Sequence, residues 1–208
     1  MRKTDWYVIQ VQVGREQKAC EVIRRACEDA SSLAPHQGMG ERMLLQECFS
    51  PAYKHRRKLK GEWIEEELQL LPGYVIAVTR NPWALSRTIY GAPEFARLVT
   101  VGKAFVPLSA DDRSWIERWT TQGDRTIPIS FGYKEGDKVV VIDGPLVGQE
   151  AMITRVNRRK RVAHLEIHAG QLTIHTTVGL EVLPRPDEHP CSIGKIDAKG
   201  VPQRTGKS

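Results

Sequence analysis

The sequence predicts an α+β domain, residues 1–120, joined by a linker, residues 121–132, to a small five-stranded β-barrel, residues 133–183. The first part mixes strand-like segments with three helical patterns, without strict alternation of strand and helix. The linker is rich in Gly, Pro and small polar residues. The last part carries short strand patterns separated by turn signals, which is typical of a small barrel.

The predicted α+β domain begins with a strand over 5–12, rich in Val, Ile and aromatic residues. After Gly14, apolar residues recur at helical spacing and predict the first helix: Ala19, Val22, Ile23 and Ala26. Residues 31–40 turn to Ser, Pro and Gly, which indicates a loop, and a strand follows around 43–49.

The next segment predicts a hairpin whose two arms carry opposite charges. Basic KHRRKLK precedes Gly61 and acidic EWIEEEL follows it, so a turn near Gly61 would pair the two signs across neighbouring strands. The segment could be a solvated, self-neutralised hairpin or a nucleic-acid patch. The acidic arm would cancel most of the field, which favours the solvated hairpin.

The rest of the α+β domain contains a buried strand, a short helix, an irregular strand region and a capped helix. LLPGYVIAVT predicts a turn and strand, 83–89 a helix, and 98–106 irregular strands. Ser109 is the expected N-cap of the last helix, because Asp111 and Asp112 follow in its first turn. That helix is expected to end near Trp119.

The barrel strands are predicted at 139–142, 151–156, 162–167, 172–177 and 180–183. Each is bounded by Gly, Pro, Asp or Asn. Residues 184–208 are poor in apolar side chains and are predicted to be a disordered tail.

Composition limits the classes of protein to consider. The chain has 208 residues, 40% hydrophobic and 27% charged, which suits a globular protein with a core and excludes a collagen-like or wholly disordered chain. The four cysteines include no C-x-x-C pair, and the N-terminal apolar stretch is too short for a signal peptide. We therefore expect a cytoplasmic protein with reduced thiols and no membrane contact. The net charge of +6 permits a nucleic-acid partner without requiring one.

The sequence carries no recognisable catalytic constellation. His164 and His168 share a face of one predicted strand, but no Cys or carboxylate lies beside them at zinc-ligand spacing. Phosphate-binding and nucleophile-elbow motifs do not occur. We expect a protein that is not an enzyme and has no metal or cofactor.

The order of the motifs resembles the NusG family of transcription elongation factors. WYVIQVQVG before a helix, then LLPGYVIAV, then VPLSADDRSWIERW, is similar to the family's N-terminal domain. EGDKVVVIDGPLVGQEAMITRVN is similar to the KOW motif of its SH3-like C-terminal barrel. The resemblance covers about residues 5–183.

This resemblance implies that the N-terminal domain binds bacterial RNA polymerase as a monomer. Members of the family grip the clamp helices of the largest subunit through an apolar depression, with Leu71 here in place of a common Phe. A short segment across the cleft touches the other large subunit and corresponds to Ser86, Arg87 and Thr88. The positions that match the depression are Trp6, Tyr7, Leu71, Pro72, Tyr74 and Ile76; for Trp6 a plain core position is an equal alternative.

The barrel departs from the general factor. Where the family has F-G-R-x-T-P-V-E-L, this chain has HAGQLTIHTTVGL, with Ala169 before Gly170, Gln171 for Arg and Ile174 for Pro. Ala151 also replaces a Gly of the KOW motif. The missing aromatic argues against the ribosome and Rho contacts that the family makes through this region.

A basic turn is the barrel's other distinctive feature. Arg158, Arg159, Lys160 and Arg161 are consecutive, with Arg155 and His164 nearby, and no acidic residue lies within 151–165. Guanidinium groups bind phosphates and stack on unpaired bases, so the turn suits nascent RNA, either a hairpin or a single-stranded loop. A solvated charged turn is an equal alternative.

Together these features predict a specialised paralogue resembling the LoaP group: an operon-specific processive antiterminator recruited by RNA through its KOW domain. Contact with the non-template DNA strand is left open. Two alternatives remain. One is a housekeeping factor that couples polymerase to the ribosome or Rho, and the other is a ribosome-associated KOW protein that binds RNA.

Overall fold

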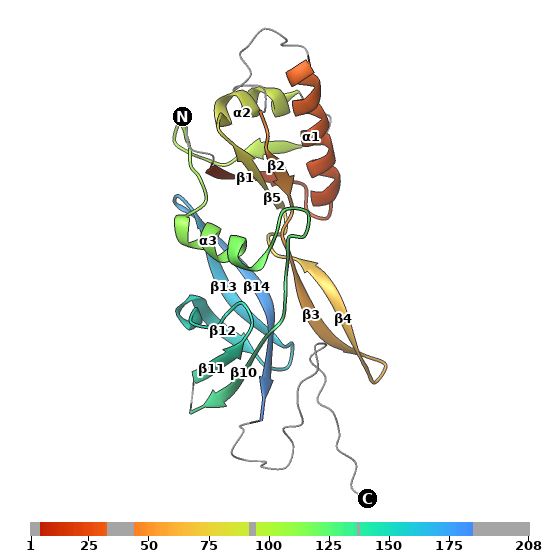
Figure 1. Ribbon diagram of the computed structural model, residues 1–208, viewed down its shortest axis with the longest axis vertical. Helices are drawn as coiled ribbons and strands as arrows, with labels where there is room; N and C mark the ends of the chain where they lie inside the picture. The colour runs from red at the N-terminus through yellow and green to blue at the C-terminus, as the bar shows by residue number, and fades with distance from the viewer. Residues whose placement is uncertain (1–4, 33–43, 92–94, 137, 185–208) are drawn as a thin grey trace, which may run out of the picture.

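The computed structural model describes residues 5–32, 44–91, 95–136 and 138–184. Its elements follow the predicted division into an α+β domain and a small barrel (Figure 1). The predicted tail, most of the 31–40 loop and the start of the predicted strand at 43 lie outside the described residues.

A four-stranded sheet forms the centre of the N-terminal domain, in the order β2 (Glu47–Phe49), β5 (Tyr74–Thr79), β1 (Asp5–Val11), β6 (Ala96–Leu98). One face packs on α1 (Glu16–Ser32) and α2 (Pro82–Tyr90) through a cluster that includes Ile9, Ile23 and Leu85. The other face presents Trp6, Val8 and Ile76. This division follows from the alternation of side chains along each strand.

The predicted last helix is α3 (Ala110–Trp119), and its cap is confirmed: Ser109 Oγ accepts a hydrogen bond from the Asp112 backbone N–H at 3.1 Å. The predicted short helix is α2, and the irregular region forms β6 with the two-residue strands β7 (Thr100–Val101) and β8 (Ala104–Phe105). Trp115 and Ile116 of α3 are buried in the same cluster as Trp6.

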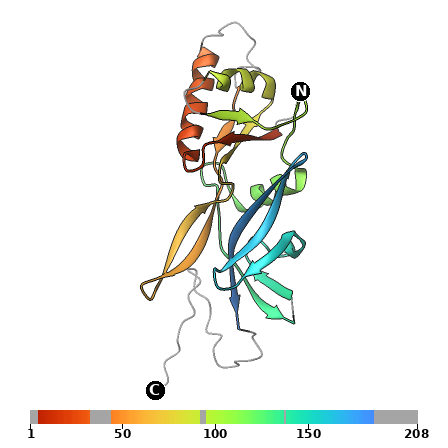
Figure 2. The same ribbon diagram turned by 180° about the vertical axis from the view of Figure 1, so that it is seen from behind.

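The charged segment forms the predicted hairpin, β3 (Ala52–Leu59) with β4 (Glu62–Gln69). The two turn residues, Lys60 and Gly61, both have positive φ, 50° and 96°, as a tight two-residue hairpin turn requires. Figure 2 shows the hairpin projecting from the sheet and running beside the barrel.

The predicted linker is ordered. Within it, β9 (Thr126–Ile127) pairs in parallel with β3, and Arg125 Nε lies 3.0 Å from Glu47 Oε1. Ile127 and Ile129 are buried, so apolar residues anchor a segment whose Gly and Pro content suggested a flexible connection.

The barrel is a curled five-stranded sheet in the order β11 (Lys138–Asp143), β10 (Ser130–Glu135), β14 (Leu172–Leu183), β13 (Val162–Ala169), β12 (Ile153–Asn157). Two predicted strand assignments change. Residues 172–177 and 180–183 belong to one strand, β14, and the fifth strand is β10, which starts inside the predicted linker. Gly179 does not break β14. A Cβ at this position would lie 2.2 Å from the Lys54 carbonyl oxygen, so the glycine allows β3 to approach closely.

The two domains are docked and share one hydrophobic core. That core joins Trp6 and Trp115 of the N-terminal domain to Leu165, Ile167 and other barrel residues. Backbone contacts also join the two domains. Leu108 forms a β-bridge with Ala169, and the Ser109 N–H donates to the His168 carbonyl at 2.9 Å. The Trp115 indole N–H donates to the Pro145 carbonyl at 3.0 Å.

Candidate functional site

The apolar positions predicted to contact polymerase divide by exposure. Pro72 is exposed and Tyr7 and Tyr74 are half-buried, so all three present surface to a partner. Leu71 and Ile76 are fully buried in the core that the two domains share. In this arrangement they support the surface and cannot be contact residues themselves. Trp6 is 2% exposed and takes its alternative role as a core residue.

The ring of Tyr7 lies in a partly apolar environment beside β5, where Tyr7 pairs with Ala77. Burial, and secondarily the nearby charge of Asp5, raises the pKa of the Tyr7 hydroxyl above its ordinary value. The hydroxyl is therefore neutral at physiological pH and can serve as a hydrogen-bond donor.

The second predicted polymerase contact lies on α2. Asn81 caps this helix by accepting the Ala84 N–H at 3.1 Å, and Leu85 and Ile89 anchor it to the sheet. Arg87 is exposed, while Ser86 and Thr88 are half-buried. The helix also exposes two large side chains, Trp83 (61%) and Tyr90 (92%), whose exposure no sequence pattern indicated.

The basic turn joins β12 to β13, as predicted. Asn157 Oδ1 accepts the Lys160 N–H at 3.0 Å and shapes the turn, and Arg161 adopts positive φ, 54°. The side chains of Arg158, Arg159 and Lys160 are exposed. These three residues give the barrel a concentrated positive charge at one point of its surface.

Arg161 differs from its neighbours. Its Nη1 lies 2.9 Å from Glu181 Oε2, and Glu181 comes from β14, outside the acid-free segment 151–165. Its guanidinium carbon also lies 3.4 Å from the centroid of the Trp63 ring. Arg161 is therefore partly neutralised and engaged with the hairpin.

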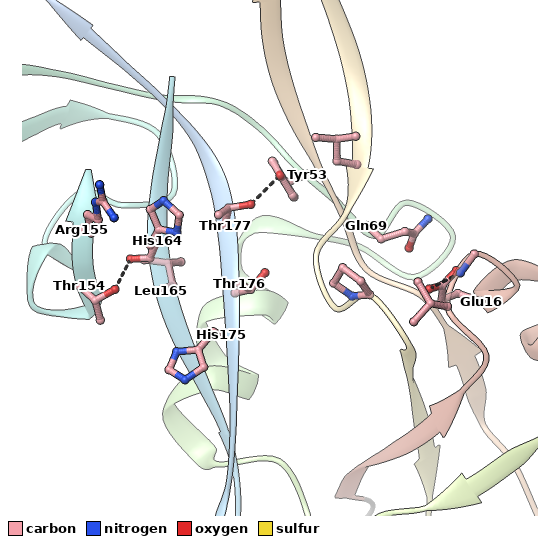
Figure 3. Close-up of a pocket in the computed structure, with 14 residues that line it drawn as sticks. Glu16, Tyr53, Gln69, Thr154, Arg155, His164, Leu165, His175, Thr176 and Thr177 are labelled. Atoms are coloured by element: carbon pink, nitrogen blue, oxygen red, sulfur yellow. Dashed lines mark hydrogen bonds between the residues drawn. The ribbon is translucent and has the colours of Figure 1, made fainter. Parts of the chain in front are cut away.

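The remaining two predicted RNA-binding residues face a cleft between the domains (Figure 3). This open cleft has a volume of about 620 Å³ and is lined by Arg155 and His164 on the barrel side and by Pro72 on the other. The Tyr53 hydroxyl and Thr177 Oγ1 share a 2.7 Å hydrogen bond at one edge of the cleft. The structure thus brings residues of both predicted sites to one cleft, but leaves Ser86, Arg87 and Thr88 outside it.

The turn that departs from the family pattern is docked onto the N-terminal domain. Ala169 is fully buried, and a Cβ at Gly170 would lie 2.6 Å from the Val106 side chain. The His168 N–H donates to Asp112 Oδ2 at 2.8 Å. Small residues at this turn are what allow the two domains to approach so closely.

Cysteine and histidine side chains form no group suited to a metal ion within the described parts of the chain. Cys20, Cys27 and Cys48 are free and buried between α1 and the sheet. Burial, with a smaller effect of Glu28, raises the pKa of the Cys27 thiol to about 11. Across the same described residues, no helix combines the length and apolar character needed to span a membrane.

The sequence matches the family described as "Transcription termination factor nusG" over residues 4–117 and the KOW motif over residues 135–168. It is 27% identical over 158 residues to the curated "Transcription termination/antitermination protein NusG" of Lactococcus lactis subsp. lactis (strain IL1403), covering 74% of this chain and 80% of the relative. Its fold is similar to the solved structure "Domain interaction in Thermotoga maritima NusG", with a TM-score of 0.52 and 20% identity, over 86% of this chain and 94% of that one.

Proposed function

The chain belongs to the NusG family of transcription factors, and from that premise we propose that it is an operon-specific processive antiterminator that binds bacterial RNA polymerase and is recruited by nascent RNA. It acts without catalysis, by holding the polymerase in a state that resists pausing and termination. The family match supports the polymerase-binding part, and the basic turn of the barrel supports recruitment by RNA.

Polymerase binding is assigned to the exposed surface of the N-terminal domain. Pro72 and Tyr74 offer surface beside the core that the two domains share, which suits the packing of a helix pair such as the clamp helices. Tyr7 lies on the opposite face of the sheet, which α1 and α2 cover, and would contact a partner from there. The α2 segment that includes Arg87 is a second contact on the same domain. Contacts from two places on one domain would hold two parts of the polymerase together.

Recruitment by RNA is assigned to the basic turn. The exposure of Arg158, Arg159 and Lys160 is the observation that carries this part of the proposal, because exposed cations can neutralise phosphates without first breaking an internal ion pair. Arg155 and His164 line the neighbouring cleft, where they could contact bases beside that backbone.

The test replaces Arg158, Arg159 and Lys160 together with Gln and measures binding of a fluorescein-labelled oligouridine of about 12 nucleotides by anisotropy. Losing three phosphate contacts should weaken binding about 100-fold near 100 mM KCl and lower the salt slope by about 2. A matched control, Arg97→Gln, Lys103→Gln and Lys138→Gln, removes the same charge from other exposed positions. Equal affinity of the turn variant and the wild type would refute RNA binding by this turn.

A housekeeping NusG-type factor is the second candidate, favoured by the name of the curated relative in Lactococcus lactis. It would couple polymerase to the ribosome or Rho. This role predicts that the protein co-purifies with ribosomes or Rho regardless of any RNA element in a leader. The docked turn at Ala169 and Gly170 argues against it, since Ala169 is buried and the backbone of Gly170 lies close against Val106 of the N-terminal domain. A ribosome-associated KOW protein is less well supported, because it would need no domain such as residues 4–117.

A further inference from the structure

Two basic segments that lie about a hundred residues apart in the sequence meet in the docked structure. The β3–β4 hairpin comes from the N-terminal domain and the β12–β13 turn from the barrel. His55 Nε2 on β3 donates a hydrogen bond to the Lys160 carbonyl oxygen at 2.7 Å. The Arg161 guanidinium lies against the ring of Trp63 on β4. These contacts fix the turn beside the hairpin (Figures 1 and 2).

A buried carboxylate joins the same two segments. Glu181, 7% exposed, lies 2.9 Å from Arg161 Nη1 through Oε2 and 3.4 Å from Arg56 Nη1 through Oε1. One carboxylate therefore holds a guanidinium from each segment. Because it is buried, this bridge is weakly screened by salt and can keep the segments in register.

The ion pairs of the hairpin neutralise its base and leave its tip positive. Lys54 and Arg56 pair with Glu65 at 3.2 and 3.5 Å, and Arg57 pairs with Glu66 at 2.7 Å. Further out, the partner opposite Lys58 is Trp63 and not an acidic residue.

Lys60 occupies the turn of the hairpin, next to Gly61 and the exposed Glu62. No ion pair joins Lys58 or Lys60 to a carboxylate within the described residues. The hairpin therefore neutralises its own charge near its base but not at its tip, where Lys58 and Lys60 lie.

We infer that the hairpin tip and the basic turn form one composite site for an unpaired RNA strand, with Lys58 and Lys60 on one side and Arg158, Arg159 and Lys160 on the other. Trp63, 48% exposed, pairs across the hairpin with Lys58 and stacks with Arg161 of the basic turn, so it contacts both segments. This inference rests on the proposed RNA-binding role of the turn and extends the site into the N-terminal domain.

The chemistry of the site suits a single strand better than a duplex. Cations on two turns can follow a flexible phosphate backbone, and an indole stacked with a guanidinium offers a platform for a base that is not paired. Both surfaces belong to the site only while the domains are docked. RNA binding at this site therefore depends on the docked arrangement of the two domains.

The experiment uses the full chain with Lys58→Gln and Lys60→Asn, chosen because Asn tolerates the positive φ at Lys60. Its control, Lys103→Gln and Lys138→Gln, carries the same net charge. Anisotropy is measured with labelled oligouridine of about 12 nucleotides, a stable RNA duplex and oligothymidine of equal length, between about 50 and 200 mM KCl. Circular dichroism and thermal melting confirm that each variant is folded.

If each lysine neutralises one phosphate, the hairpin variant should bind oligouridine about 25-fold more weakly near 100 mM KCl, with a salt slope lower by about 1.4. The control should stay near wild type, and oligouridine should bind more tightly than the duplex or the DNA.

Wild-type affinity of the hairpin variant, when the turn variant is impaired, would overturn the composite site and leave the RNA-binding turn standing. If neither variant loses affinity, the proposed function fails with it. An equal loss in the control would reduce the effect to net charge and overturn the inference. Equal binding of oligothymidine would overturn the assignment to RNA.

Discussion

Replacing Glu181 with Gln should loosen the contact between the hairpin and the barrel. Glu181 is buried, and its carboxylate bridges Arg161 and Arg56, so the variant removes the anion that the two guanidinium groups share. The amide oxygen of Gln can still accept one hydrogen bond. The loss therefore corresponds to about one charge-assisted hydrogen bond, about 2 kcal/mol of the free energy of unfolding.

The assay is urea denaturation followed by tryptophan fluorescence, with thermal melting in parallel. Because the domains share one core, we expect a single transition, with a melting temperature about 4–8 °C lower in Glu181→Gln. Glu62→Gln is the matched control. Glu62 is exposed, and no ion pair involves it among the described residues, so its effect should stay within about 0.5 kcal/mol.

A double-mutant cycle separates the bridge from a general loss of charge. Glu181→Gln and Arg161→Gln should be non-additive, with a coupling energy of about 1.5 kcal/mol, because each removes the same contact. Additive effects, or a loss below about 0.5 kcal/mol in Glu181→Gln, would refute the bridge as a force that holds the hairpin to the barrel.

Three further predictions concern buried groups. Trp115→Phe should lower the free energy of unfolding in urea by about 1–3 kcal/mol, since the Pro145 carbonyl loses its donor; an effect no larger than that of Trp119→Phe would contradict this. Burial acts to raise the pKa of Glu16, but backbone N–H donors outweigh it and lower the pKa below its ordinary value. The carboxylate therefore stabilises the fold fully above the unfolded pKa of about 4.3, and this stabilisation is lost as the pH falls through the folded pKa. The stability of Glu16→Gln, melted from pH 6 to 3, should therefore approach that of the wild type at low pH, and a constant difference would disprove the linkage. The Cys27 thiol, with its pKa raised to about 11, should alkylate far more slowly at pH 8 in the native protein than in urea, as mass spectrometry of each cysteine peptide can determine; equal rates would show that it is not buried.

Local sequence signals predicted the elements whose determinants lie close together in the chain. The hairpin around Gly61 followed from opposite charges flanking a glycine, and the α3 cap followed from Ser109 with acidic residues after it. The barrel class followed from short strands with turn signals. Such patterns depend on backbone conformation over a few residues, which sequence alone encodes well.

Contacts between distant segments escaped prediction. Gly179 seemed to end a strand, but its role is to admit the Lys54 carbonyl of another domain. Arg161 seemed free of acidic neighbours, because its partner Glu181 lies on a later strand. Ile76 matched a family contact position, yet its side chain is buried in the core that the domains share. The first and last of these outcomes depend on domain docking, and the Arg161–Glu181 pair depends on how strands far apart in the sequence assemble within the barrel. A local pattern carries no signal for either.

Transcription in vitro through an intrinsic terminator tests the central proposal most directly. Bacterial RNA polymerase is assayed with and without the protein, on templates that carry or lack the leader of its own operon. The antiterminator account predicts readthrough only with the leader, and loss of that readthrough when Arg158, Arg159 and Lys160 are replaced. Polymerase binding with no readthrough on either template would contradict the account and favour the housekeeping role.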